Sequence, residues 1–251
     1  IHRRYDAKWH FPFSAFLCDY QGGIALIVLL EVSQCLVHRG ILGDVALVPD
    51  ICLHYLLFDR EAVSAALAYL RRRFPERSSL RLLWDTYRLF VSQGRCLVDR
   101  YAALAGRPFQ FEFHGLEQLR TAGSQGFILL LAHVGNWQIA LTALRNLGRP
   151  VCLLMRPEDS PAVADYLRVS TTGAEVRLVD PQSPFGGVIE LLRYLSEGWI
   201  VCMMGDRGYH FQSTPVRFLG DSARFPQGAF RIAAAAGCPV LFFFALRAGH
   251  A

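Results

Sequence analysis

The spacing of apolar positions changes near residue 105. Before that point apolar residues recur at helical spacing, most regularly over residues 78–104, which predicts a long amphipathic helix there. From about residue 109, short apolar runs alternate with helical stretches, and this alternation is typical of a layered α/β domain with a mainly parallel sheet flanked by helices. We therefore predict a helical portion over residues 1–105 and an α/β core over residues 106–251.

The elements of the core follow from the same alternation. Strands are predicted at residues 109–113, 126–132, 151–155, 175–179, 199–204, 216–219 and 239–246. Between them helices are predicted at residues 116–121, 136–147, 161–171, 186–196 and 227–237.

The N-terminal portion contains two apolar segments that fall short of a membrane span. Residues 22–37 are interrupted by Glu31, residues 45–58 are shorter still, and a spanning helix needs about 20 apolar residues. These segments are more typical of helices that lie against a membrane. A further helix is predicted from its cap at Asp59 to the stop at Pro75. Its final arginines, residues 71–73, suit either a solvated helix end or lipid phosphates.

Composition and charge narrow the class of protein. The chain has 251 residues, 53% of them hydrophobic, and a net charge of +5 that comes almost entirely from arginine, because Lys8 is the only lysine. This balance suits an anionic membrane surface or a phosphorylated substrate, and no nucleic-acid-binding motif is present. The seven cysteines form no C-x-x-C pair and indicate buried free thiols in a reducing compartment. Neither they nor the histidines have metal-ligand spacing, so no metal site is predicted. No cleavable signal peptide is evident.

The segment LLLAHVGNWQIA places a polar group at the end of a predicted buried strand. His133 follows the apolar run, and the next helix is predicted to begin at Asn136, a natural helix cap. Ligands of α/β sheets bind at this edge, where Gly135 permits a tight turn and free N–H groups of the helix can stabilise an anion. A histidine there can act as a general base. The alternative is an ordinary structural histidine.

Two further segments point to the same sheet edge. In MMGDRGY another apolar strand ends in Gly205 and the charged pair Asp206 and Arg207, which predicts either a substrate clamp or a solvated loop. In RFPQGAFRIAAAAG, a tight turn is predicted to open an alanine-rich helix whose small residues permit close approach of an acyl chain; its residues are Phe225, Pro226, Gln227 and Gly228.

Taken together, these segments resemble the lipid A biosynthesis acyltransferases, a bacterial lauroyl and myristoyl acyltransferase family of the lysophospholipid acyltransferase superfamily. The resemblance rests on FEFHGLEQL, GFILLLAHVGNWQIALTAL, VCLLMRPED, VCMMGDRGY and VRFLGDSARFPQGAFRIAAAAGCPVLFFFAL, and more weakly on LHYLLFDREAVSAALAYLRRRFPE, residues 53–76. The family continues beyond the position of Ala251, so we expect a C-terminal part to be missing.

The resemblance implies transfer of a fatty acyl group from an acyl carrier protein or acyl-CoA, as co-substrate, to a membrane lipid acceptor. It implies no further cofactor, no acyl-enzyme intermediate, and a location at the cytoplasmic face of a bacterial inner membrane, held peripherally or by the N-terminal portion. His133 matches the family's general base, and Asn136 the first turn that shapes the site. Arg156, in MRPED, and Arg207 are candidates for contacts with a lipid phosphate or the donor's phosphopantetheine. Asp206, Phe225, Pro226 and Gly228 match the substrate-binding positions.

The chain departs from the family pattern five residues after the histidine, where Gln138 replaces a carboxylate. Gln138 can orient the imidazole but carries no charge to stabilise the imidazolium. Three interpretations follow: Gln138 supports a working His133, another carboxylate such as Asp206 takes the electrostatic role, or the protein has lost catalysis and binds lipid. We favour the first two combined. A hydrolase or thioesterase using His133 and water is a competing enzyme class.

Overall fold

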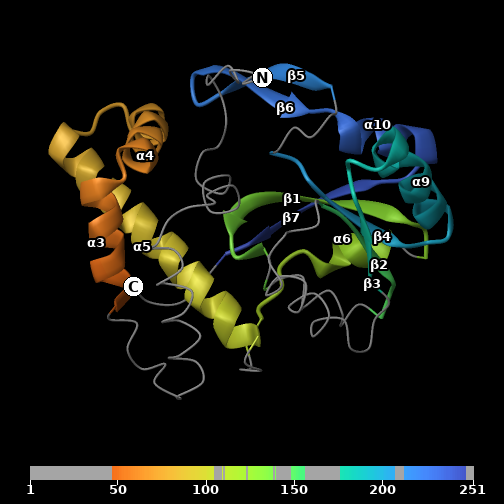
Figure 1. Cartoon of the computed structure of the whole chain (residues 1–251). Coiled ribbons are helices and arrows are strands. Elements are labelled where there is room, and N and C mark those ends of the chain that lie inside the picture. Colours follow the sequence, from red (N-terminus) through yellow and green to blue (C-terminus); the bar gives the residue numbers. More distant parts are fainter. Residues whose placement is uncertain are drawn as a thin grey trace. The chain divides into compact units, whose positions relative to one another are not determined.

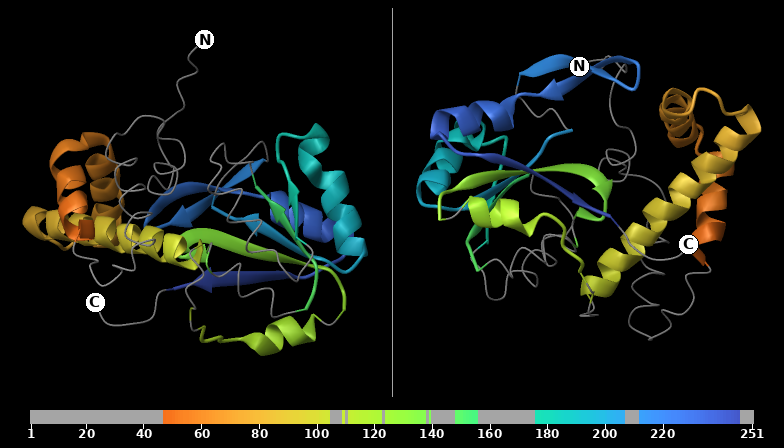
Figure 2. Two further views of the ribbon diagram at one scale, coloured as in Figure 1. Left: turned by 60° about the horizontal axis from the view of Figure 1, so that its bottom comes forward. Right: turned by 180° about the vertical axis from the view of Figure 1, so that it is seen from behind.

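Figure 1 shows the computed structural model of the chain, and Figure 2 shows two further views of it. The structure describes residues 47–104, 109, 111–122, 124–137, 139, 148–155, 176–206 and 212–246. It divides into two compact units at Ala105 and Gly106, and the segment Pro215–Arg224 belongs with the first unit.

The first unit contains three helices: α3 (Leu47–Phe58), α4 (Arg60–Arg73) and α5 (Ser79–Leu104). As predicted, α4 begins after Asp59, whose side chain accepts a hydrogen bond from the backbone N–H of Ala62 at 3.0 Å, and it ends just before Pro75. The three helices pack through a common apolar cluster of Val48, Cys52, Ala62, Ala66 and Phe90. Among the residues that the structure describes, no helix has the length and apolar character needed to cross a membrane.

The second unit is built on a five-stranded parallel sheet with strand order β3-β2-β4-β1-β7. Its strands are β1 (Phe127–Gly135), β2 (Val151–Leu154), β3 (Val176–Val179), β4 (Ile200–Met204) and β7 (Val240–Ala245). This confirms the predicted α/β class. Strands β1 and β4 are neighbours in the sheet although about 65 residues of chain separate them. Such a long connection is expected, because two parallel strands can be joined only by a crossover.

The two faces of the sheet bury different helices. Alternate strand residues such as Ile128 and Leu130 pack with α9 (Val188–Ser196) and α10 (Gly228–Ala236), which lie next to one another in Figure 1. The intervening residues, such as Leu129 and Leu131, form a second cluster with Leu119 of α6 (Leu116–Thr121). The central strands are buried on both faces, which explains why their sequences are continuous apolar runs.

Three local predictions differ from the structure. Of residues 109–113, those that the structure describes form no strand, although apolar and polar residues alternate in this segment with the two-residue period of a strand. The predicted turn at residues 225–228 is a strand end followed by a helix: Phe225 and Pro226 close β6 (Asp221–Pro226), and Gly228 begins α10. The 3-10 helix η2 (Pro184–Gly187) precedes α9, so only part of the helix predicted at residues 186–196 is α-helical.

Strand β6 pairs with β5 (Ser213–Phe218), and only Leu219 and Gly220 connect them. Both connecting residues have positive φ, 51° and 81°, as a type I′ hairpin turn requires. Sequence patterning missed β6 because DSARFP has no apolar run. A hairpin strand is specified by its turn and its local partner, so it does not need one. The helix predicted at residues 161–171 and most of that at 136–147 lie outside the described residues.

Candidate active site

Strand pairing brings His133 and Asp206 together. In the β1–β4 pair, Leu131 lies opposite Met204, and these two side chains come two residues before His133 and Asp206 respectively. Since neighbouring parallel strands run in the same direction, equal offsets from a registered pair end side by side at the carboxyl edge of the sheet. The two polar residues are 73 positions apart in the sequence, yet they meet at this edge.

The carboxylate of Asp206 holds His133 at two points. Its Oδ1 lies 2.9 Å from His133 Nδ1, and its Oδ2 accepts a hydrogen bond of 2.7 Å from the His133 backbone N–H. The side chains are only 9% and 8% exposed, so the contact is shielded from water and correspondingly strong. An ionised carboxylate can only accept, so His133 Nδ1 donates to it, and in the neutral imidazole Nε2 is then the acceptor nitrogen.

Backbone contacts at two glycines fix the strand ends that carry these residues. The N–H of Gly205 donates to the Leu131 carbonyl oxygen at 2.7 Å, directly before Asp206. Gly135 has φ +65°, and a Cβ at this position would lie 1.9 Å from the carbonyl oxygen of Ala245. The N–H of Asn136 donates to that same oxygen at 2.9 Å. Only glycine fits at position 135, where β1 turns past the end of β7.

The indole of Trp137, two residues after Gly135, packs against the imidazole of His133. The ring centroids of His133 and Trp137 are 5.8 Å apart with an interplanar angle of 82°, an edge-to-face arrangement. Trp137 also packs against the apolar cluster that contains Leu129 and Leu131. The imidazole is therefore held by a charged partner at Nδ1 and by an aromatic ring.

This edge of the sheet lies inside a segment that matches a known family. Residues 108–251, more than half of the chain, match the sequence model of the family described as bacterial lipid A biosynthesis acyltransferase. The chain belongs to this acyltransferase family. No curated protein sequence matches the chain significantly. The family assignment confirms the resemblance to lipid A biosynthesis acyltransferases and supports transfer of an acyl group to a lipid.

The structure places some of the predicted site residues of this acyltransferase and leaves others outside the described ranges. His133, Asn136 and Asp206 lie together at the carboxyl edge of β1 and β4. Phe225, Pro226 and Gly228 lie at the junction of β6 and α10. The predictions for Gln138, Arg156 and Arg207 fall outside the described residues.

Sequence reasoning gave no role to Trp137 or Gly205, both of which contact the acyltransferase site. Trp137 follows His133 by four residues, and Gly205 precedes Asp206 directly. Their closeness in the sequence to His133 and Asp206 was the feature that could have indicated a role for them. Among the described residues, no cluster of histidine, cysteine and carboxylate side chains could hold a metal ion.

Three buried cysteines, Cys52, Cys152 and Cys202, are poorly suited to nucleophilic catalysis. Burial raises the pKa of the Cys52 thiol to about 11 and that of Cys152 to about 12, and it raises the pKa of the Cys202 thiol further still. A thiol must ionise to attack, so these three are poor nucleophiles near neutral pH.

Proposed function

We propose that the protein transfers a fatty acyl group from a thioester, carried by acyl carrier protein or CoA, to a hydroxyl group of a membrane lipid, with His133 as the general base. The observation that supports this most directly is the contact of Asp206 with His133 Nδ1. It leaves Nε2 as the basic nitrogen at a sheet edge where ligands bind. The reaction class comes from the family, and the roles of individual residues are our proposal.

The proposed reaction is a direct attack on the thioester. Nε2 of His133 takes the proton from the acceptor hydroxyl as its oxygen bonds to the thioester carbonyl carbon. The tetrahedral intermediate collapses, the carbon–sulfur bond breaks, and the imidazolium returns the proton to the leaving thiolate. Acyl ester and free thiol are the products, and no oxidant, reductant or metal is consumed.

Asp206 is proposed as the positioning residue for this base. Its carboxylate keeps the proton on Nδ1 and stabilises the imidazolium that forms in the transition state. The resemblance to the family assigns most of this role to a carboxylate five residues after the histidine, and this chain has Gln138 at that position. We propose that Asp206 supplies the charge and that Gln138 contributes orientation alone.

The remaining site residues are proposed to hold the substrates. Arg156 and Arg207 are candidates for phosphate groups of the lipid or the phosphopantetheine, and Asn136 shapes the first turn after His133. Phe225, Pro226 and Gly228 are proposed to contact the acyl or acceptor portion. The proposed location is the cytoplasmic face of a bacterial inner membrane, where carrier-bound donor and lipid acceptor meet.

The first test follows a labelled acyl group from acyl carrier protein, and separately from CoA, into total bacterial membrane lipids. We expect labelled lipid with the wild type and only background with His133→Ala, while circular dichroism shows both proteins folded. The labelled product identifies the acceptor, and the donor that works identifies the carrier. Release of free fatty acid as the sole product would instead indicate a thioesterase.

The second candidate function is lipid binding by an acyltransferase fold that has lost catalysis. Gln138 at the position of the usual carboxylate is the observation that favours it. In that case a folded wild type would bind membrane lipid yet transfer no label from either donor, and His133→Ala would behave identically.

A further inference from the structure

The first half of α5 exposes large apolar side chains along one face. Leu80 is 82% exposed and Trp84 is 52% exposed, and Leu83 is also exposed beside them. Leu80, Trp84 and Arg88 are spaced four residues apart, so they lie along a single stripe of the helix. The opposite face carries the buried residues Leu82, Thr86 and Phe90, and Phe90 belongs to the apolar cluster of the unit. We call Leu80, Leu83, Trp84, Arg81 and Arg88 the α5 face.

The charges on the α5 face are positive. Arg81 and Arg88 are exposed, and Arg88 has no ion-pair partner among the described residues. The single acidic residue in this half of the helix is Asp85, and it is turned inward and only 7% exposed. The surface that remains is therefore apolar and aromatic with arginines at its margin.

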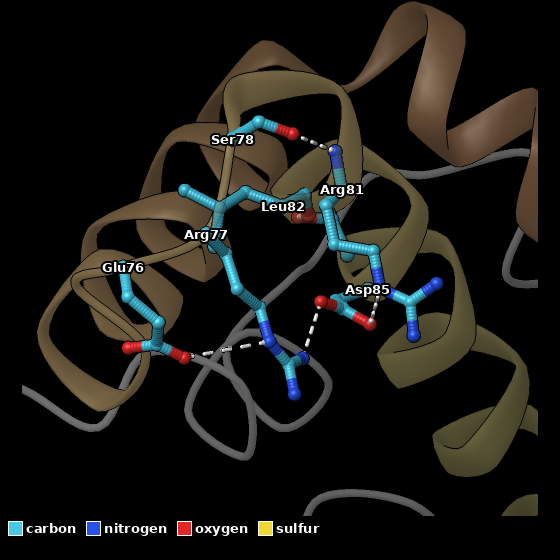
Figure 3. A network of polar contacts seen from close by, with 7 residues as sticks. Glu76, Arg77, Ser78, Arg81, Leu82 and Asp85 are labelled. Carbon is cyan, nitrogen blue, oxygen red and sulfur yellow. Dashed lines mark hydrogen bonds and ion pairs between the residues drawn. The ribbon is translucent and has the colours of Figure 1, made fainter.

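Figure 3 shows how Asp85 is neutralised. Its Oδ2 lies 2.6 Å from Arg77 Nη1, and its Oδ1 lies 3.8 Å from Arg81 Nε. Arg77 also stacks on the ring of Phe74 at 3.7 Å and approaches Glu76 at 3.9 Å. These contacts tie the loop before α5 to its first turns and keep the carboxylate away from the exposed stripe.

The ring of Trp84 also packs against a neighbouring aromatic side chain. Its ring lies 5.4 Å from that of Tyr87, whose hydroxyl donates to the Pro49 carbonyl oxygen of α3 at 3.5 Å. The indole therefore sits on an anchored aromatic residue while about half of its surface stays open. An amphipathic indole at the edge of an apolar patch is the side chain that favours the headgroup region of a bilayer.

We propose that the α5 face docks on an anionic phospholipid surface. Leu80, Leu83 and Trp84 enter the boundary between headgroups and acyl chains, and Arg81 and Arg88 contact lipid phosphates. The charge complementarity selects this partner, because a neutral apolar protein surface would desolvate Arg88, which has no ion-pair partner among the described residues, without supplying a counter-charge. This contact goes beyond the reaction proposed above and adds a residue-level membrane surface separate from the arginines at residues 71–73.

The test uses the full chain and vesicles of phosphatidylglycerol and phosphatidylcholine in equal parts, with acyl chains brominated so that they quench tryptophan fluorescence on contact. We expect quenching in the wild type and its loss in Trp84→Phe. Trp199→Phe is the matched control, since Trp199 is buried against Tyr194 and its removal leaves the quenchable fluorescence in place. All proteins compared also carry Trp9→Phe and Trp137→Phe, so the quenching reports only Trp84 and Trp199, whichever other segments also bind.

Affinity measurements by vesicle flotation separate the apolar and charged contributions. Leu80→Gln is expected to weaken binding about tenfold and Arg88→Gln about fivefold, with the second effect vanishing at high salt. Ile189→Gln and Arg193→Gln on α9 are matched controls, exposed in the second unit, that should bind as the wild type does.

Several results would overturn the proposal. Wild-type quenching that persists in Trp84→Phe would place the contact elsewhere, and equal binding to pure phosphatidylcholine vesicles would remove the role of charge. A wild-type dimer that Leu80→Gln converts to a monomer would make the α5 face an interface between copies. Because binding needs no acyl donor, any of these results leaves acyl transfer to detergent-dispersed lipid as a separate question.

Discussion

The two ends of the central strands both carry polar contacts, but the contacts have different consequences. At the amino end, the Arg149 guanidinium donates to the carbonyl oxygens of Ser124, Gln125 and Gly198, and it lies over the Phe127 ring at 5.2 Å. These bonds join the loops that lead into β1, β2 and β4. Arg149 thus binds three backbone carbonyl groups and lies over one ring, and it acts as a structural clamp.

At the carboxyl end, Asp206 satisfies one imidazole nitrogen of His133 and leaves the other available. No hydrogen-bond partner of Nε2 occurs among the described residues. Since both ends of the sheet are partly buried, burial alone does not mark the active site. The carboxyl end differs from the amino end in one respect. It holds a fixed side chain, His133, whose second ring nitrogen remains available to react, whereas Arg149 at the amino end is used in structural contacts.

Substitution of the two candidate partners of His133 gives the largest expected contrast. Asp206→Asn should lower kcat/KM for acyl transfer by about 10³ to 10⁴-fold, because the amide removes the charge that favours the imidazolium. Gln138→Ala should lower it by less than about tenfold, since no charge is lost. Steady-state assays with both donors measure this. A severe loss in Gln138→Ala with a mild effect of Asp206→Asn would reverse the assignment.

Gly135→Ala tests how tightly the carboxyl end is built. The Cβ would meet the Ala245 carbonyl oxygen at 1.9 Å, and φ is +65°, so we expect a loss of about 3 kcal/mol in the free energy of unfolding. Gly148→Ala is the control, because φ is +63° there but nothing lies within 4 Å of the added carbon. It should cost about 1 kcal/mol. Chemical denaturation of both variants is the measurement, and equal costs would show that the close approach is absent.

Arg149→Met removes the carbonyl contacts at the amino end of the central strands and leaves the residues around His133 unchanged. Loss of the carbonyl contacts should lower the free energy of unfolding by about 1–2 kcal/mol, since the guanidinium is only partly buried. The kcat/KM of the folded fraction should stay at the wild-type value. Denaturation curves and assays below the unfolding transition test the two statements. A specific loss of activity in the stable protein would give this end of the sheet a catalytic role.

The buried thiols give the smallest expected effect. Burial raises the pKa values of Cys152 and Cys202, so their unfolded forms ionise at lower pH than the folded forms. The contribution of these two thiols to stability should therefore be constant below the ordinary thiol pKa of about 8.5 and fall as pH rises above it. Urea midpoints at neutral and alkaline pH test this, and peptide mapping after iodoacetamide treatment should show both thiols unmodified in native protein. Rapid alkylation of either would contradict their burial.

Local sequence patterns were sufficient for most of the fold. Helix α4 followed from its Asp59 cap and Pro75 stop, and the central strands followed from apolar runs that a doubly covered sheet requires. The patterns failed where pairing decides the outcome: β6 is polar but held by a tight turn, whereas residues 109–113 alternate like a strand without being one in the described part.

The candidate site was predictable in its members but less so in its pairing. His133 and Asp206 were each recognisable as polar residues that follow an apolar run; the structure places His133 near the end of β1 itself. That they contact one another depends on the order and register of β1 and β4, which no local pattern encodes. The additional hydrogen bond from the His133 backbone N–H to Asp206 depends on the same register.

The central claim is that Asp206 holds the proton on Nδ1 of His133 and leaves Nε2 basic. Nitrogen NMR of protein labelled with ¹⁵N-histidine measures it directly, with the His133 signals identified by their absence in His133→Ala. The account predicts that the proton of the neutral imidazole lies on Nδ1 and not on Nε2, and that this fixed tautomer is lost in Asp206→Asn. A His133 that carries its proton on Nε2, or one whose signals are unchanged in Asp206→Asn, would contradict it.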